Sequence, residues 1–357
     1  MKHTHLILWS LLMAGSLTYG RAQETTSGQR PRLTTQSVEQ RPRKQRPPFN
    51  PANPSVHDPV MAWQGDTCYL FSTGMGISVM SSTDMKFWKR ERPVFSTPPQ
   101  WAVDLIPGFR GHIWAPDIIF HQGRYHLFYS CSAFGKNTSA IGHASSPTLN
   151  PEDTDFAWVD HGMVVQSVPG RDNWNAIDAN IIIDGEGSPW MSFGSFWDGI
   201  KIVRLSNDMD SIATPQQWHT IARKRGNDMP PADEQEPGDN AIEAPFIFRH
   251  GSYYYLFVSH DYCCRGKEST YKIVVGRAER VQGPYTDKEG RRLDQGGGTI
   301  VAQGNGRYAG IGHQAAYTFN GSDFLIAHGY DLERNGMSVL VVRPIIWDNE
   351  GWPHIEL

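Results

Sequence analysis

The chain has 357 residues, of which 39% are hydrophobic and 20% are charged, a composition typical of a globular protein with a sizeable core. Residues 1–49 hold eight Lys and Arg against two Asp and Glu, so residues 50–357 carry 25 basic and 35 acidic side chains, a net charge of −10. That acidity argues against a nucleic-acid-binding protein. The 35 Gly, 24 Pro and abundant aromatic residues favour a turn-rich β protein over a helical one.

Residues 1–22 have the pattern of a secretory signal peptide. Lys2 and two histidines precede an apolar stretch of 12 residues from Leu6 to Leu17, and small residues lead to a cleavage site after Ala22. A membrane anchor is the alternative, but this stretch falls short of the about 20 residues that a spanning helix needs. We therefore expect an exported protein, periplasmic or extracellular, without a membrane span.

Residues 23–54 are predicted to be a flexible linker. They are rich in Gln, Arg, Pro and Thr and have no apolar period. The basic cluster "RPRKQR" within them is more typical of a solvated tail than of a contact with an anionic partner. A single domain is then expected over residues 55–357.

The chain has four cysteines, Cys68, Cys131, Cys263 and Cys264. They are too few for a disulfide framework and lack zinc-ligand spacing. An exported protein could oxidise them, but a bridge between the adjacent Cys263 and Cys264 would be strained. Buried free thiols are the default expectation for all four.

Five copies of one pattern fill the chain from residue 56 onward. In each copy an apolar triplet, a turn containing Gly and an aromatic-rich strand follow a short segment of mixed character. The copies are "VHDPVMAWQGDTCYLFSTG", "WAPDIIFHQGRYHLFYSC", "IDANIIIDGEGSPWMSFGSF", "IEAPFIFRHGSYYYLFVSH" and "GHQAAYTFNGSDFLIAHGY". A third strand follows each copy, and a weaker fourth strand follows the third, as "AWVDHGMVV" does in the second copy.

Four strands in each of five repeats predict an all-β fold, a five-bladed β-propeller. A doubly wound α/β fold is the structural alternative, but it needs helical patterns between the strands, and the sequence has no long ones. In a propeller the first strand of each blade lines the central axis. Equivalent positions of the five copies therefore form a ring around that axis.

Ionisable residues gather at one repeat position. Three residues before the apolar triplets stand Asp58, Ala115, Asp178, Glu243 and His313. In the second copy Asp117, two residues after Ala115, lies on the same strand face. Acidic residues before strands are often turn or capping residues. Three carboxylates at one repeat position, with no obvious basic partner, point instead to a functional site on the axis.

Converging carboxylates are suited to glycoside hydrolysis, in which one acts as the acid and another as the base. A third can raise the pKa of the acid by charge repulsion. Sugars also need stacking faces and hydrogen-bonding side chains, and the candidates near the axial strands are Trp114, Phe134, Asn175, Ser195, Phe196 and Trp197. Core packing is the alternative for each aromatic residue, although the loop-like "GSFWDG" favours a contact role for Phe196 and Trp197.

The sequence resembles the family 43 glycoside hydrolases, and within them the endo-acting α-1,5-L-arabinanases. The resemblance rests on "VHDP", "WAPD", "NAIDAN", "SFGSFWDGIK", "IEAPF", "DYCCRG", "GGGT" and "GIGH", and it covers about residues 55–357. "HDP" or "WAPD" alone would indicate only the wider superfamily. Proline is expected where "NAIDAN" has Ala179, a departure that leaves the carboxylate unchanged.

The resemblance implies a catalytic propeller that cleaves internal α-1,5 linkages of arabinan with inversion at the anomeric carbon. It implies that Asp58 is the general base, that Glu243 is the general acid, and that Asp178 tunes the acid and orients the substrate. It also implies that two segments and one glycine contact the substrate, namely Asn175, Ala176, Ile177 and Asp178, then Ser195, Phe196 and Trp197, and Gly135.

The resemblance further implies that His313, in "GIGH", ligates an axial metal ion, usually calcium, whose other ligands are mostly waters. Calcium prefers oxygen ligands, so this expectation rests on the resemblance and not on the type of donor. The expected partners are arabinan and arabino-oligosaccharides, and the expected oligomeric state is a monomer.

Two alternatives stay open. The first is an exo-acting α-L-arabinofuranosidase or a β-xylosidase of the same family, which would have a closed pocket and often carries a C-terminal β-sandwich, whereas this sequence ends with the last blade. The second is a sugar-binding propeller without catalysis, against which the three carboxylates argue.

Overall fold

The computed structural model describes residues 48–225 and 236–357. Residues 48–357 form one compact unit. The predicted signal peptide and most of the predicted linker, residues 1–47, lie outside the described residues. In the described ranges, no helix is both long and apolar enough to cross a membrane.

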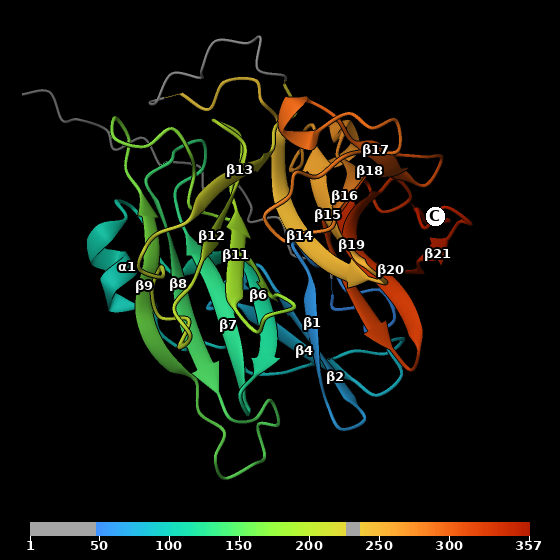
Figure 1. Cartoon of the computed structure of the whole chain (residues 1–357). Helices are drawn as coiled ribbons and strands as arrows, with labels where there is room; N and C mark the ends of the chain where they lie inside the picture. The colour runs from blue at the N-terminus through green and yellow to red at the C-terminus, as the bar shows by residue number, and fades with distance from the viewer. Residues whose placement is uncertain (1–47, 226–235) are drawn as a thin grey trace, which may run out of the picture. The chain divides into compact units, whose positions relative to one another are not determined.

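Antiparallel sheets follow one another along the chain as the five blades of a β-propeller, which confirms the predicted fold (Figure 1). Blade 1 consists of β1 (Val60–Gln64), β2 (Thr67–Ser72), β4 (Ser78–Ser82) and β5 (Lys89–Arg90). Blade 2 consists of β6 (His112–His121), β7 (Arg124–Cys131), β8 (Ser139–Ser146) and β9 (Val159–Ser167), and β3 (Gly74–Met75) pairs with β6. Blade 3 consists of β10 (Asn180–Ile183), β11 (Pro189–Phe193), β12 (Ile200–Arg204) and β13 (Trp218–Ala222).

The last two blades continue the same order. Blade 4 consists of β14 (Ile242–His250), β15 (Tyr253–His260), β16 (Lys272–Ala278) and β17 (Thr299–Ala302). Blade 5 has the three strands β18 (Tyr308–Phe319), β19 (Ser322–Asp331) and β20 (Met337–Pro344), and a separate hairpin follows, β21 (Ile346–Trp347) with β22 (Pro353–His354). The short helices are α1 (Gln100–Leu105), η1 (Gly266–Glu268) and η2 (Leu293–Gln295).

Within residues 48–225 and 236–357, the sheet of blade 5 has three strands and not the expected four, and the chain before blade 1 contacts the edge of β20. The N–H of Leu340 donates to the carbonyl of Pro54 at 3.1 Å. Arg334 donates to the carbonyl of Asn53 at 2.9 Å, and the hydroxyl of Ser55 donates to the carbonyl of Ser338 at 2.9 Å. The N–H of Trp88 also donates to the carbonyl of Pro51 at 3.0 Å. The prediction of a flexible linker is therefore wrong for residues 51–54, because blades 1 and 5 supply partners for their backbone.

The apolar strand positions pack between neighbouring blades. One buried cluster joins blades 2 and 3 and includes Phe128, Ile141, Met191 and Phe193. A second cluster joins blades 3 and 4, and a third, larger cluster spans blades 5, 1 and 2 with part of blade 4. Each blade is covered on both faces, which accounts for the continuous apolar runs in the sequence.

Candidate active site

Each inner strand is kinked close to the repeat position at which the sequence gathers its ionisable residues. The kink lies just before β1 and β10, and within β6, β14 and β18. Register shifts mark the kinks in β6, β14 and β18. One residue in each blade has a positive φ there, which a non-glycine residue adopts only when its surroundings hold it. These residues are Asp58 (55°), Ala115 (39°), Asp178 (60°), Ala244 (54°) and His313 (49°).

The backbone N–H of each kinked residue donates to a side chain of the preceding blade, with blade 5 preceding blade 1. Four of these bonds run from Asp58 to His328 Nδ1 (3.1 Å), from Ala115 to Thr73 Oγ1 (2.8 Å), from Asp178 to Ser130 Oγ (3.1 Å) and from His313 to Ser259 Oγ (2.9 Å). In the fifth, Ala244 donates to Asp178 Oδ2 at 3.1 Å. Since buried N–H groups need partners, these bonds link the five kinks into one ring and fix their side chains.

The predicted alignment of the repeats is wrong by one residue in blade 4. Strand pairing makes Phe246 the counterpart of Asp117, so the counterpart of Ala115 is Ala244 and not Glu243. The apolar run of β14 begins one residue earlier than in the other repeats, and that early start shifted the alignment. Glu243 lies one residue before the kink and still reaches the axial residues.

Asp58 is held as an ionised carboxylate. Its Oδ2 accepts a hydrogen bond from the hydroxyl of Thr73 at 2.5 Å. Its Oδ1 lies 3.0 Å from Nδ1 of His313 and 3.2 Å from Nδ1 of His57. Burial favours the neutral acid, but the two imidazoles hold the pKa of Asp58 well below its usual range. The ionised state is the one that a general base requires.

Glu243 is half-buried, and both of its carboxylate oxygens accept hydrogen bonds. The hydroxyl of Tyr271 donates to Oε1 at 2.7 Å, and the hydroxyl of Ser195 donates to Oε2 at 2.7 Å. The two donors come from different blades, Ser195 from the loop after β11 and Tyr271 from the residue before β16. The carboxyl group is therefore fixed in orientation, as an acid that must meet a leaving oxygen needs to be.

The charges of Asp58 and Glu243 both act on the carboxyl group of Asp178. Burial raises the pKa of Asp178 to about 8, with a contribution from the charges of Glu243 and Asp58 and with His313 opposing. A proton therefore remains on this group of carboxyls at neutral pH, next to the ionised Asp58. One carboxylate paired with another carboxyl that keeps its proton is the arrangement that acid–base catalysis uses.

His313 lies beside the acids and is half-buried. Burial disfavours its charge, but Asp58, Asp178 and Glu243 outweigh this and raise the pKa of His313 to about 9. Nδ1 of the ring is engaged by Asp58, so Nε2 is the nitrogen that could ligate a cation once it has lost its proton. The surrounding carboxylates fit a divalent cation in charge, and because the ring is a single nitrogen donor, waters would have to supply the oxygen ligands that calcium prefers.

The remaining predicted contacts in blade 2 lie on the side where the inner strands begin. Trp114 is half-buried in β6, and its Nε1 donates to Nδ1 of His112 at 3.0 Å. Phe134 and Gly135 lie in the loop after β7, and Phe134 is 82% exposed, which is unusual for so large an apolar side chain. Because Trp114 pairs with Ser130 at the end of β7, this loop lies at the same edge as the kinks.

The predicted contacts in blade 3 differ widely in accessibility. Ala176 has no exposed surface and packs in the core between blades 2 and 3, so a sugar contact by its side chain is incompatible with this structure. Asn175, Ile177 and Trp197 are each more than nine-tenths buried. Phe196 is half-buried, and its ring centroid lies 6.0 Å from that of Tyr262.

Cys263 and Cys264 form a disulfide, so the expectation of free thiols is wrong for this pair. Neither residue is buried, whereas Cys68 and Cys131 are buried free thiols as expected. A bridge between adjacent cysteines was expected to be strained, but the loop has a left-handed backbone at Cys264, with φ 66°, and holds the pair together.

Hydrogen bonds connect the loop of this disulfide to Asp58, the predicted general base. The N–H of Cys264 donates to the hydroxyl of Tyr330 at 2.7 Å, and that hydroxyl lies 3.0 Å from Nε2 of His57. His57 in turn contacts Asp58.

Sequence reasoning missed several residues that hold the site. They are Thr73, His57, Tyr271 and His328. Tyr271 had no signal in the sequence, and the structure shows that it depends on Gly312 of "GIGH", because a Cβ there would lie 2.2 Å from its ring. His57, in "VHDP", stood next to a predicted catalytic residue.

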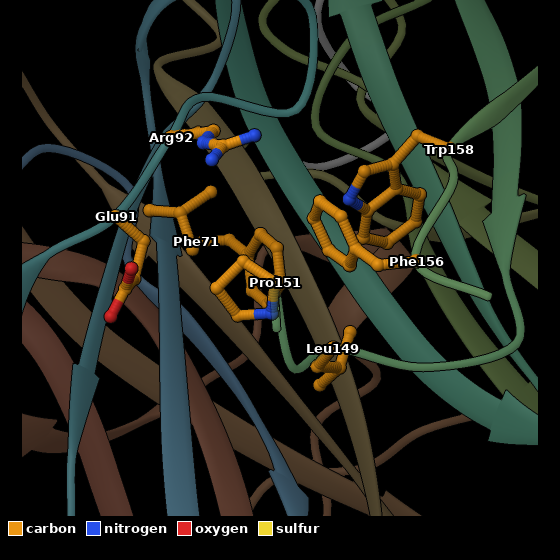
Figure 2. A pocket seen from close by; sticks show the side chains of 8 residues that line it. Phe71, Glu91, Arg92, Leu149, Pro151, Phe156 and Trp158 are labelled. Atoms are coloured by element: carbon orange, nitrogen blue, oxygen red, sulfur yellow. The ribbon is translucent and has the colours of Figure 1, made fainter. Parts of the chain in front are cut away.

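A pocket away from the axis is too small to compete with this site. It lies where β2 faces the segment between β8 and β9, and Phe71, Leu149, Pro151, Phe156 and Trp158 surround it (Figure 2). Its volume of about 10 Å³ suits a single water molecule and not a sugar ring.

Residues 49–353 match the family described as glycosyl hydrolases family 43. The chain belongs to this family. An extracellular exo-α-1,5-L-arabinofuranosidase of Cellvibrio japonicus is 51% identical over 301 residues, which cover 84% of this chain and 86% of that protein. An extracellular endo-α-1,5-L-arabinanase of Bacillus subtilis is 39% identical over 306 residues, which cover 85% of this chain and 88% of that protein.

A solved structure of an arabinan-degrading enzyme is also similar to this chain. The α-L-arabinanase of Cellvibrio cellulosa in complex with arabinohexaose is similar with a TM-score of 0.82 and 50% identity, over 85% of this chain and 96% of that chain. This member of family 43 is thus a glycoside hydrolase with a five-bladed propeller, as the sequence predicted. Its relatives include both exo-acting and endo-acting enzymes.

Proposed function

We propose that this family 43 hydrolase cleaves the α-1,5 linkages of L-arabinan with inversion, with Glu243 as the general acid and Asp58 as the general base. The observation that carries the proposal is the convergence of Asp58, Asp178 and Glu243, from three blades, around His313. The substrate class is supported by the two extracellular relatives and by the arabinohexaose complex of a third.

In the proposed mechanism Glu243 delivers a proton to the leaving arabinosyl oxygen. Ser195 and Tyr271 hold the carboxyl of Glu243 in position for that step. Asp58 removes a proton from a water on the opposite face of the sugar, and the anomeric carbon inverts through an oxocarbenium-like state. The donor hydroxyl of Thr73 keeps Asp58 aligned toward that water.

The substrate is positioned by residues at the rim in this proposal. Phe134 offers an exposed face for stacking, and Trp114, Ser195 and Phe196 lie nearer the axis. A calcium ion at His313 would supply positive charge near the acids. His313 itself balances the charge of Asp58 and orients it through the contact of 3.0 Å.

The proposal also covers whether the enzyme cleaves arabinan at a chain end or at internal linkages. The sequence motifs indicated cleavage of internal linkages, whereas the relative with the higher identity, 51% against 39%, is named an exo-acting enzyme. We therefore propose release of short products from a chain end, with internal cleavage as the alternative. The extracellular relatives and the signal pattern of residues 1–22 support export from the cell.

One experiment tests both the activity and its mode. The protein is incubated with debranched arabinan, linear xylan and an aryl arabinofuranoside, and viscosity, reducing ends and product lengths are followed together. Chain-end attack predicts reducing ends and short products on arabinan while the viscosity falls slowly, whereas internal cleavage predicts an early collapse of viscosity. Inversion predicts that the β-anomer appears first by proton NMR. No hydrolysis of arabinan, or hydrolysis of xylan alone, would refute the proposed substrate.

A further inference from the structure

A second cluster of ionisable side chains lies away from the axis, where blade 2 meets blade 3. His143 is on β8, His161 is on the neighbouring β9, and Asp210 is in the turn that follows β12. The three offer ligand atoms that all lie within 4.8 Å of one another. The hydrolytic mechanism uses none of them.

The atoms that face each other are two imidazole nitrogens and a carboxylate oxygen. Oδ1 of Asp210 lies 2.6 Å from Nδ1 of His143 and 3.5 Å from Nδ1 of His161. The two rings are nearly parallel, with centroids 4.6 Å apart and an interplanar angle of 17°. Ligand atoms at about 2.0–2.2 Å from a tetrahedral zinc ion are about 3.3–3.6 Å apart. The separation of Asp210 from His161 already fits this range, and Asp210 and His143 would have to move apart by about 1 Å to complete the coordination shell.

The other nitrogen of each ring already has a partner. Nε2 of His143 lies 3.0 Å from Nδ1 of His126, and Nε2 of His161 lies 2.8 Å from the hydroxyl of Ser145. Such outer partners are what metal-ligating histidines use to fix the ring and its tautomer. Surface histidines that merely contact a carboxylate do not need them.

The cluster is also open on one side and negatively charged there. The side chain of His143 is 1% exposed, whereas those of His161 and Asp210 are 29% and 42% exposed. A cation could therefore enter from solvent and keep water ligands. Asp208 adds a second carboxylate to the same turn, where it accepts a hydrogen bond from the N–H of Asp210 at 3.2 Å.

We propose that Nδ1 of His143, Nδ1 of His161 and the carboxylate of Asp210 form a binding site for a divalent transition-metal ion, with Zn²⁺ as the matching ion. Two imidazoles and a carboxylate suit zinc, copper or nickel, whereas calcium takes oxygen ligands. On binding, the proton of His143 moves from Nδ1 to Nε2 and is donated to Nδ1 of His126, whose own proton moves to its Nε2. The ion then joins β8 and β9 of blade 2 to the turn of blade 3, in addition to the proposed hydrolytic function.

The test is zinc binding by protein that carries no histidine tag and has been stripped with a chelator. Calorimetry should give about one Zn²⁺ per chain, and Zn²⁺ should raise Tm relative to the stripped protein. His161→Gln and Asp210→Asn should lose both effects, and both change exposed side chains. Ser145→Ala should weaken binding by about 10- to 100-fold, because it frees the far nitrogen of His161 without touching the ion.

Two controls separate this site from others. His354→Ala removes an exposed histidine in β22 and should bind zinc like the unchanged protein. His313→Ala should also retain zinc binding, since the axial residues lie outside the cluster. With Co²⁺ as the probe, visible absorption should report nitrogen and oxygen ligands and should vanish in His161→Gln. Absence of saturable zinc binding, or binding that survives in both His161→Gln and Asp210→Asn, would overturn the proposal and leave the arabinanase proposal untouched.

Discussion

The hydroxyl of Tyr271 donates to Oε1 of Glu243 at 2.7 Å, and Gly312 provides the space for that tyrosine ring. A Cβ on Gly312 would lie 2.2 Å from Cδ1 of the ring. The same ring stacks near His328, with centroids 5.8 Å apart, and His328 accepts the N–H of Asp58. One buried tyrosine thus connects the surroundings of the proposed acid with those of the proposed base.

Tyr271→Phe removes one hydrogen bond to Glu243 and leaves the ring in place. Hydrogen bonds to charged groups are worth about 1.5–3 kcal/mol, so kcat/KM on arabinan should fall by about 10- to 100-fold. Tyr285→Phe is the matched control, because that buried hydroxyl donates to the carbonyl of Val281, away from the axis. Steady-state kinetics and thermal unfolding of both variants check the prediction, which fails if the two lose the same activity.

Asp178 should determine the alkaline limb of the rate profile. The pKa of Asp178 is raised to about 8, so the proton that the reaction needs is present below that pH and is lost as the pH rises through it. We expect log kcat/KM to fall above about pH 8. Asp178→Asn removes one of the charges that retain the proton, so its alkaline limb should move to lower pH. An unchanged limb in this variant would exclude Asp178 from the titration.

Removal of the imidazole in His313→Ala should lower activity more than stability. The ring balances the charge of Asp58 at 3.0 Å and is the one side chain proposed to ligate an axial ion. Calcium titration of chelator-stripped protein should raise kcat in the unchanged protein and have no effect in the variant. Equal responses to calcium in both proteins would place any functional ion elsewhere.

The repeats, and with them Asp58 and Asp178, could be predicted from the sequence because the same strand pattern recurs five times and both acids stand at the same position in it. Because the apolar run of β14 begins early, Glu243 was aligned with the kinked position that Ala244 holds, although the Ala-Pro pair shared by residues 115–116 and 244–245 carried the correct register. The partners of Glu243 were also out of reach, since Ser195 and Tyr271 meet it only after the blades close around the axis.

The ends of the predicted domain were less accurate for a related reason. The composition of residues 48–54 is that of a linker, and the hydrogen bonds that hold them come from distant residues of the propeller, Trp88, Arg334 and Leu340. Likewise, the Cys263–Cys264 disulfide depends on a loop conformation that side-chain patterns do not encode. Local patterns predicted the strands, whereas contacts between distant segments had to come from the structure.

A buried carboxyl outside the catalytic trio should make stability depend on pH. Asp117 is 2% exposed and accepts the N–H of Ile181 at 2.7 Å, and burial raises its pKa from 3.8 to about 7. Between these values the folded state holds the extra proton, so the free energy of unfolding should fall as the pH rises. At about 1.4 kcal/mol per pKa unit, the upper limit of the effect is about 4 kcal/mol.

Two reciprocal variants measure that effect. Asn180 is the counterpart of Asp117 in blade 3 and accepts the N–H of Ile247 at 2.8 Å, so an asparagine is known to suit this position. Asp117→Asn should flatten the decline in stability between pH 5 and 8, and Asn180→Asp should add a decline of the same sign. Urea unfolding at several pH values measures both slopes. An unchanged slope in Asp117→Asn would show that Asp117 is not the group responsible.

The most direct test of the account is the activity of Glu243→Gln on two substrates with different leaving groups. In arabinan the leaving group is a hydroxyl oxygen of the next arabinosyl unit, which is a poor leaving group and needs protonation, whereas a dinitrophenyl arabinofuranoside has a good leaving group and needs little. The variant should lose about 10²- to 10⁴-fold on arabinan and far less on the aryl substrate, while Asp58→Asn should lose activity on both because the water still needs its base. Equal losses of Glu243→Gln on the two substrates would contradict the assignment of Glu243 as the acid.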